Sequence, residues 1–419
     1  MLTTKITTLN LQYNVINCKA INYLLLVTLF LCLSFNSLAV TSISDLKSQQ
    51  KHEILYNIHA YYVEDLPLQS SFEDQQQFEA LFKKLDPYSK FLDENELDAL
   101  FDSTNGRYTG LGIEVQEHGE HILIISALKN SPAYHAGILQ NDVLLAINNQ
   151  PVANKKISQV ASMIQESESS TIHLTIKREN AKAPLDFAIT RREINLESVT
   201  SSLDDFGIGY IAINSFTNYT VHDLSRQLAK LKANNGGALT GLVLDLRDNP
   251  GGTLQSAVAV SDLFLQSGTI VSTKGRFYDA NQHFTANEGD VLNGSPIVVL
   301  INENSASAAE ILAAALKDND RATLVGSKSF GKGSVQSLIP LGNGDTALKL
   351  TTAKYFSPSG KSIDGVGVAP DVAINQSVLP QIDKVAIIKT EQGKSDQPWL
   401  GNNPTDQQLL KAKQLLSMK

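Results

Sequence analysis

A lysine between two glycines is the first feature of this sequence that could do chemistry. It is Lys332, in the segment "VGSKSFGKGSVQS" at Val325–Ser337. Residues 326–332 match the first seven positions of the phosphate-loop pattern G-x-x-x-x-G-K-[ST], but Gly333 replaces the hydroxyl residue. The following "GSVQSLIPL" alternates like a strand, whereas a phosphate loop opens a helix. The segment therefore argues against a nucleotide site and leaves a base as the alternative.

A lysine can act as a general base only when its pKa is lowered, because an ammonium ion cannot accept a proton. Burial lowers the pKa of a lysine, and the neutral amine can then activate a serine hydroxyl. Taken alone, the segment favours a surface lysine in a loop made mobile by Gly331 and Gly333.

The serine that could serve as nucleophile lies in "NSASAAE", Asn304–Glu310. This segment follows a predicted buried strand and opens a predicted helix, whose N-terminal amides can stabilise a developing oxyanion. Ser307 and Glu310 also have the spacing of a capping box, which is a structural feature of helix starts. Both interpretations remain open from spacing alone.

A third segment, "RDNPGG" at Arg247–Gly252, directly follows another predicted buried strand. Gly251 and Gly252 lack side chains and can turn backbone amides into a cleft, which would make an oxyanion hole. An ordinary Asn-Pro-Gly turn is the alternative.

The elements around these segments predict an α/β layer structure for residues 190–375. "ALTGLVLDLR", "SPIVVLIN" and "RATLVGS" are typical of buried strands. Between them, "TLQSAVAVSDLFLQSG" and "SASAAEILAAALKDND" have helical patterns, the first closed by Gly268. Strands that alternate with helices predict a layered α/β domain.

The preceding residues 101–189 predict a small β-rich domain. Their pattern places a hairpin turn at His118–Glu120 and a short helix that starts near Pro132 and ends near Gly137. Residues 40–100 and 376–419 are polar and predict helical segments at the two ends.

The first residues predict a secretory signal. Lys5 and Lys19 are the only charges before Asp45, and an apolar run occupies Tyr23–Phe35. This largely apolar run of thirteen residues is too short to span a bilayer comfortably. We expect residues 1–39 to be a signal peptide cleaved after Ala39, with an uncleaved anchor as the alternative.

Composition excludes several classes of function. The net charge is −8, with no basic run, which argues against a nucleic-acid partner. Cys18 and Cys32 both lie in the predicted signal, so the mature chain would have no cysteine nucleophile, cysteine metal site or disulfide. His118 and His121 have no evident third metal ligand, and no metal or cofactor is expected.

Taken in order along the chain, these motifs resemble the carboxy-terminal processing peptidases, tail-specific serine proteases of family S41 with an inserted PDZ domain. The resemblance covers most of the mature chain. It rests on "LDPYSKFL", "GLGI", "SPAYHAGILQNDVLLAINNQPV", "LDLRDNPGG", "NSASAAEILAAAL", "VGSKSFGKGSVQ" and "LTTAKYFSPSGKSIDGVGVAPDV". It implies an α/β protease core with crotonase- or ClpP-like layers, interrupted by a PDZ domain and flanked by helical segments.

The resemblance also implies a role for individual residues. Ser307 would be the nucleophile, Lys332 the base, and Gln336, on the same strand face, the residue that orients the lysine. The oxyanion donors would be the amides of Gly251, Gly252 and Ala308. The residues that bind the substrate's C-terminus would be Gly110, Leu111, Gly112 and Ile113. Asn141 stands where the PDZ motif usually has glycine, and asparagine tolerates the left-handed backbone needed there.

The expected function is therefore an exported, periplasmic endopeptidase that needs no cofactor. By resemblance, its partners would be proteins or peptides with flexible, apolar C-terminal tails, and it would form a homo-oligomer that binds no nucleic acid. The sequence does not identify an adaptor protein. The rival hypothesis is a non-catalytic PDZ scaffold, which could dispense with Ser307 and Lys332.

Overall fold

The computed structural model describes residues 48–66, 80–374 and 406–418, apart from single positions 129, 166, 168, 180, 196 and 343. The predicted signal at residues 1–39 and most of the predicted tail at 376–419 lie outside these described residues. None of the helices in the described segments is long and apolar enough to cross a membrane.

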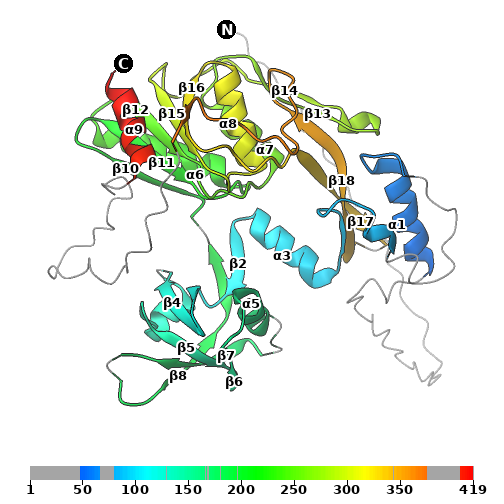
Figure 1. Cartoon of the computed structure of the whole chain (residues 1–419), viewed down its shortest axis with the longest axis vertical. Helices are drawn as coiled ribbons and strands as arrows, with labels where there is room; N and C mark the ends of the chain where they lie inside the picture. Colours follow the sequence, from blue (N-terminus) through cyan, green and yellow to red (C-terminus); the bar gives the residue numbers. More distant parts are fainter. Residues whose placement is uncertain are drawn as a thin grey trace, which may run out of the picture. The chain divides into compact units, whose positions relative to one another are not determined.

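A largely parallel sheet forms the centre of the α/β region (Figure 1). Its strand order is β10-β11-β12-β15-β16-β19, and only the β10–β11 pair is antiparallel. β12 and β15 are buried along their whole length, as expected for strands covered on both faces. The strands are β10 (Val199–Leu203), β11 (Ile208–Ile213), β12 (Gly241–Asp245), β15 (Ile297–Ile301), β16 (Ala322–Gly326) and β19 (Val372–Ala373).

Helices cover both faces of this sheet. Leu242 and Leu244 pack against one group of helices, whereas Val243 packs against α9, because successive side chains of a strand point to opposite faces. Figure 1 shows α9 lying across β12 and β15. The first group is α6 (Thr220–Asn234), α7 (Leu254–Asp262) and α8 (Ala308–Asp318), and α9 spans Gln407–Ser417. The layered α/β architecture expected from the sequence is confirmed.

The predicted end of α7 at Gly268 is wrong, because the helix stops at Asp262. The carbonyl oxygens of Leu263 and Phe264 accept hydrogen bonds from Val291 N–H (2.8 Å) and Arg321 Nε (3.0 Å). Because these two carbonyl oxygens accept bonds from distant residues, they are not available for the hydrogen bonds of further helical turns.

A second sheet is built around the long strand β18 (Thr346–Phe356). β17 pairs along one edge of β18, while β1 and β13 pair with different parts of its other edge. α1 packs on this sheet through Ile54 and Ile58, which lie in one core with Leu348 and Leu350. The bounds are α1 (Ser48–Tyr61), β1 (Lys90–Leu92), β13 (Thr269–Lys274), β14 (His283–Thr285) and β17 (Ser334–Leu341). The strand predicted after Lys332 is therefore confirmed as β17.

The β-rich unit has its own sheet, in the order β3-β4-β5-β7-β8, and its own apolar core. β2 and β9 pair with each other at the two ends of this unit. Asn141 has a φ of 70°, the left-handed conformation expected from the sequence. The elements of this unit are β2 (Arg107–Gly110), β3 (Ile113–His118), β4 (His121–Ala127), α4 (Pro132–Ala136), β5 (Val143–Ile147), β6 (Gln150–Pro151), α5 (Ile157–Gln165), β7 (Thr171–Lys177), β8 (Leu185–Thr190) and β9 (Arg192–Asn195). The preceding helix α3 (Glu94–Thr104) packs on the β18 sheet through Leu97, which lies in one core with Leu92 and Ala347.

Candidate active site

Ser307 lies at the junction between β15 and α8, where the backbone takes an unusual conformation. Its φ and ψ angles are 55° and −114°, a region that costs a non-glycine residue about 1–3 kcal/mol. The side chain is half-buried, and its hydroxyl contacts the buried phenol of Tyr355. α8 starts at the next residue, Ala308. The turn therefore presents a hydroxyl at the positive end of a helix.

Two backbone N–H groups beside Ser307 have no acceptor among the described residues: those of Gly252 and Ala308. The N–H of Gly251, in contrast, donates to Asn249 Oδ1 at 2.8 Å. A Cβ atom on Gly251 would lie 2.8 Å from Ser307 Cβ and 3.0 Å from Ala308 N, so a side chain would not fit there. Of the three expected oxyanion donors, two are unused and one is already engaged.

The loop that carries Gly251 is fixed from within the core by Asn249, which is fully buried. Its side-chain Nδ2 donates to Ile213 O at 2.6 Å, and its backbone carbonyl oxygen accepts from Ala306 N–H at 2.9 Å. The second of these bonds joins the glycine loop directly to the residue before Ser307.

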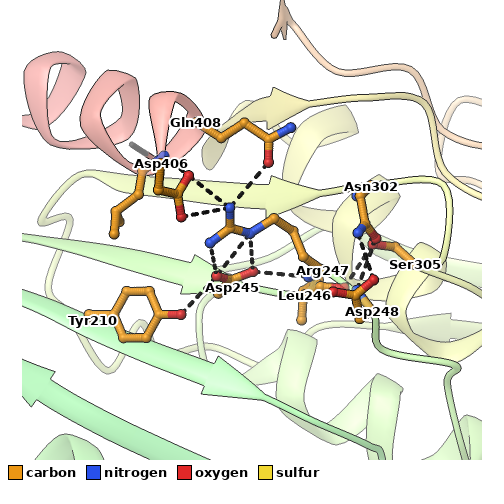
Figure 2. Close-up of polar contacts among 10 residues, drawn as sticks. Tyr210, Asp245, Leu246, Arg247, Asp248, Asn302, Ser305, Asp406 and Gln408 are labelled. Carbon is orange, nitrogen blue, oxygen red and sulfur yellow. Dashed lines mark hydrogen bonds and ion pairs between the residues drawn. The ribbon is translucent and has the colours of Figure 1, made fainter. Parts of the chain in front are cut away.

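Figure 2 shows a second set of contacts, around Arg247 at the start of the same loop. Arg247 Nε lies 2.9 Å from Asp245 Oδ1, and Nη1 donates to Asp406 Oδ1 (2.9 Å) and Gln408 Oε1 (3.2 Å). Tyr210 donates to Asp245 at 2.8 Å. Burial acts to lower the pKa of Arg247, but the two carboxylates outweigh it and raise the pKa. The guanidinium thus links β12 to α9.

Lys332 lies in the loop between β16 and β17 and is half-buried. Burial lowers its pKa, and the charge of Lys349 lowers it further. The carboxylates of Asp86 and Glu310 act in the opposite direction but are outweighed. A lowered pKa is what a lysine needs in order to serve as a base near neutral pH.

The side chains of Lys332 and Ser307 are not hydrogen-bonded to each other in the described structure. The Lys332 ammonium instead lies over the ring of Tyr88, 4.6 Å from its centroid. The backbone carbonyl of Lys332 accepts a hydrogen bond from the Tyr355 hydroxyl. Catalytic hydrogen bonds are often long or absent before substrate binds, so this arrangement is compatible with a dyad.

Gln336, expected to orient the lysine, contacts other groups. Its Nε2 donates to Ser334 Oγ at 2.9 Å and Thr351 Oγ1 at 3.1 Å. The register shift between Val335 and Gln336 places the extra residue, Thr352, on β18, so Ser334 and Gln336 still share one face of β17. Lys332 lies before β17 begins, so strand alternation does not extend to it.

The expected C-terminus-binding loop, residues 110–113, lines an apolar cavity of about 130 Å³ between β3 and α5. Val115, Val160 and Ile164 form part of its wall. A Cβ on Gly112 would lie 2.2 Å from Ser131 Cβ, and the φ of Gly112 is 78°, so this position requires glycine. The cavity is lined mainly by apolar side chains, which suits it to an apolar group.

Spacing alone did not identify Tyr88, Tyr355 or Asn249 as neighbours of the site. No group of three His, Cys, Asp or Glu side chains suited to a metal ion occurs among the residues described. Arg178, which follows β7, pairs with Asp142 at 2.7 Å within the β-rich unit.

Comparisons with known proteins found two family models and several relatives that match this chain. The model for peptidase family S41 matches residues 207–374, and the PDZ domain model matches residues 123–178. The carboxy-terminal-processing protease of Bartonella bacilliformis is 41% identical over 298 residues, covering 71% of this chain and 68% of that protein. The carboxyl-terminal-processing protease of a Synechocystis species is 34% identical over 320 residues, covering 75% and 74%.

Among solved structures, a photosystem II D1 C-terminal processing protease has a TM-score of 0.52 and 25% identity to this chain. The similarity covers 80% of this chain and 95% of that one. The S41 match contains both Ser307 and Lys332, whereas the PDZ match starts after the loop at 110–113.

Proposed function

Because the chain belongs to peptidase family S41, among the carboxy-terminal processing serine proteases, we propose that it hydrolyses peptide bonds with a Ser307–Lys332 dyad. The conformation of Ser307 carries this proposal. It has a φ of 55° and lies beside the unused N–H groups of Gly252 and Ala308. Strain and unused donors around one serine are features of an acyl-transfer site more than of a helix cap.

The reaction begins with transfer of the Ser307 hydroxyl proton to the neutral amine of Lys332, which must first rotate away from Tyr88. The serine oxygen then attacks the peptide carbonyl carbon, and the amides of Gly252 and Ala308 stabilise the oxyanion. Lys332 returns the proton to the leaving amine. Water, deprotonated by the same lysine, hydrolyses the acyl-enzyme and regenerates Ser307.

Substrates reach this site through the β-rich unit. The substrate's C-terminus would add as a strand beside β3, with its carboxylate on the amides of Gly110, Leu111, Gly112 and Ile113. Its last side chain would enter the cavity lined by Val160 and Ile164. The substrates are therefore proteins or peptides with flexible tails that end in an apolar residue.

The predicted signal supports export to the periplasm, where unfolded protein tails are accessible substrates. Its apolar run at Tyr23–Phe35 follows the basic Lys5 and Lys19 and precedes a small-residue cleavage site at Ala39. The proposed enzyme requires no cofactor and acts as a homo-oligomer.

The test is digestion of a flexible protein with an apolar tail by the wild type, Ser307→Ala and Lys332→Ala. Lys328→Ala is the matched control, because Lys328 is an exposed lysine of the same loop. We expect wild type and Lys328→Ala to cut, and the two dyad variants to lose at least about 1,000-fold in rate. Amidating the tail should weaken cleavage by removing the carboxylate.

Retained cleavage by Ser307→Ala would exclude the dyad. Tail binding without cleavage by every variant, wild type included, would favour a binding scaffold.

A further inference from the structure

A single carboxylate connects the two residues of the proposed dyad. Glu310 is fully buried, and its Oε2 accepts the backbone N–H of Ser307 at 2.8 Å and that of Lys332 at 2.9 Å. Its Oε1 accepts the Ser329 hydroxyl at 2.5 Å and the Gly331 N–H at 2.7 Å. One oxygen atom therefore receives the amides of both the nucleophile and the base.

These contacts exceed what a helix cap requires. Of the four hydrogen bonds that the Glu310 side chain accepts, a capping box accounts for only one, from the Ser307 N–H. The other three donors come from residues 329–332, which lie outside α8, and the Lys332 amide is 22 positions away in sequence. The Ser329 oxygen already accepts from Val368 N–H at 2.7 Å, which leaves its proton for Glu310.

The charge state of Glu310 follows from the same contacts. Four donors face its two oxygens and no acceptor in the described part of the chain does, so the side chain is in the acceptor-only, ionised form. Hydrogen bonds to an ionised acceptor are roughly twice as strong as neutral ones. Glu310, a fully buried carboxylate on the first turn of α8, thus holds residues 329–332 in a fixed position.

We infer that Glu310 is a positioning residue that sets the separation between Ser307 and Lys332. The inference rests on the proposed dyad. Only the Lys332 side chain then has to rotate to reach Ser307, because both backbones are already fixed on one oxygen atom. Misplacement of a reacting group by 1 Å can cost about 100-fold in rate, so loss of this attachment should lower kcat.

The negative charge of Glu310 gives a second measurable effect, on the pKa of Lys332. Removing it should lower the pKa of Lys332, because the carboxylate favours the ammonium form. The acid limb of kcat/KM should then move to lower pH. The charged or polar groups that face Lys332 are Asp86 and Tyr88 from the turn before β1, Lys349 and Tyr355 from β18, and Glu310 from α8.

The experiment compares Glu310→Gln, which keeps the length and removes the charge, with Glu310→Asp, which keeps the charge and shortens the reach. Both should lower kcat about 100-fold with KM for the tail substrate unchanged. Only Glu310→Gln should shift the acid limb to lower pH. The control is Glu303→Gln, which changes an exposed glutamate whose Oε2 accepts the Ser327 hydroxyl at 2.9 Å, and it should keep wild-type kinetics.

Rates are normalised to folded enzyme by circular dichroism and by tail-peptide binding, so that unfolding is not counted as loss of kcat. Normal kcat per folded molecule in both Glu310 variants, or an unchanged acid limb in Glu310→Gln, would overturn the inference. The proposed function fails separately, through retained cleavage by Ser307→Ala.

Discussion

The cluster around Arg247 and the cluster around Glu310 both bury carboxylates beside the proposed active-site loops, but they neutralise charge differently. The Arg247 guanidinium lies between the carboxylates of Asp245 and Asp406, and each of these contacts joins two side chains. Glu310 accepts three backbone N–H groups and one hydroxyl, and no cation among the described residues is bonded to it.

The Arg247 and Glu310 clusters therefore have different structural roles. The Arg247 cluster connects parts of the chain that are 159 positions apart, and it attaches α9 to the strand that ends at the glycine loop. The Glu310 cluster fixes backbone atoms of the reacting residues themselves. Breaking the first should therefore mainly cost stability, whereas breaking the second should mainly cost rate.

The largest effect on stability is expected from Arg247→Ala, because it leaves the carboxylates of Asp245 and Asp406 buried without their cation. Removing one partner of a buried ion pair costs about 3–5 kcal/mol. Guanidinium denaturation measures the free energy of unfolding. Arg226→Ala is the control, since Arg226 is 60% exposed in its pair with Asp223, and it should cost no more than about 0.5 kcal/mol. Equal losses in both variants would remove the contrast.

A smaller loss is expected from Asp406→Asn, which tests the link to α9 alone. Asparagine can still cap the helix, and Arg247 keeps its bonds to Asp245. We expect a loss of about 1–2 kcal/mol in the free energy of unfolding, from one weakened charged hydrogen bond. A loss as large as that of Arg247→Ala would mean that α9, and not the arginine, holds the cluster together.

The smallest expected change is a shift in the pH profile of Lys349→Met. The Lys349 charge lowers the pKa of Lys332, so its removal raises that pKa. Since the neutral amine is the base, the acid limb of kcat/KM should move to higher pH, with little change well above it. This direction is opposite to that expected for Glu310→Gln. A shift to lower pH would show that Lys349 acts on the reaction by another route.

Local patterns in the sequence were enough to predict much of the fold. The alternation after Lys332 predicted β17, Pro132 and Gly137 bounded α4, and Asn141 took the left-handed conformation expected of it. Each of these features is determined by residues within a few positions. The ordered motifs predicted the family, which the relatives confirm.

Contacts between distant segments could not be predicted in this way. Glu310 has the spacing of a cap, and nothing nearby indicates that Lys332 would share its oxygen. Gln336 donates to Thr351 beside a register shift in which β18 carries the extra residue, and the side chain of Asn249 accepts the N–H of Gly251. These outcomes depend on which loops meet in the folded chain, which spacing does not encode.

The most direct test of the central claim is to identify the residue that a serine-reactive fluorophosphonate modifies, by mass spectrometry of the labelled protein. The account predicts a single adduct on Ser307, formed faster as pH rises through the lowered pKa of Lys332 and strongly slowed in Lys332→Ala. An adduct on another residue, or labelling of Ser307 that is indifferent to Lys332→Ala, would contradict it.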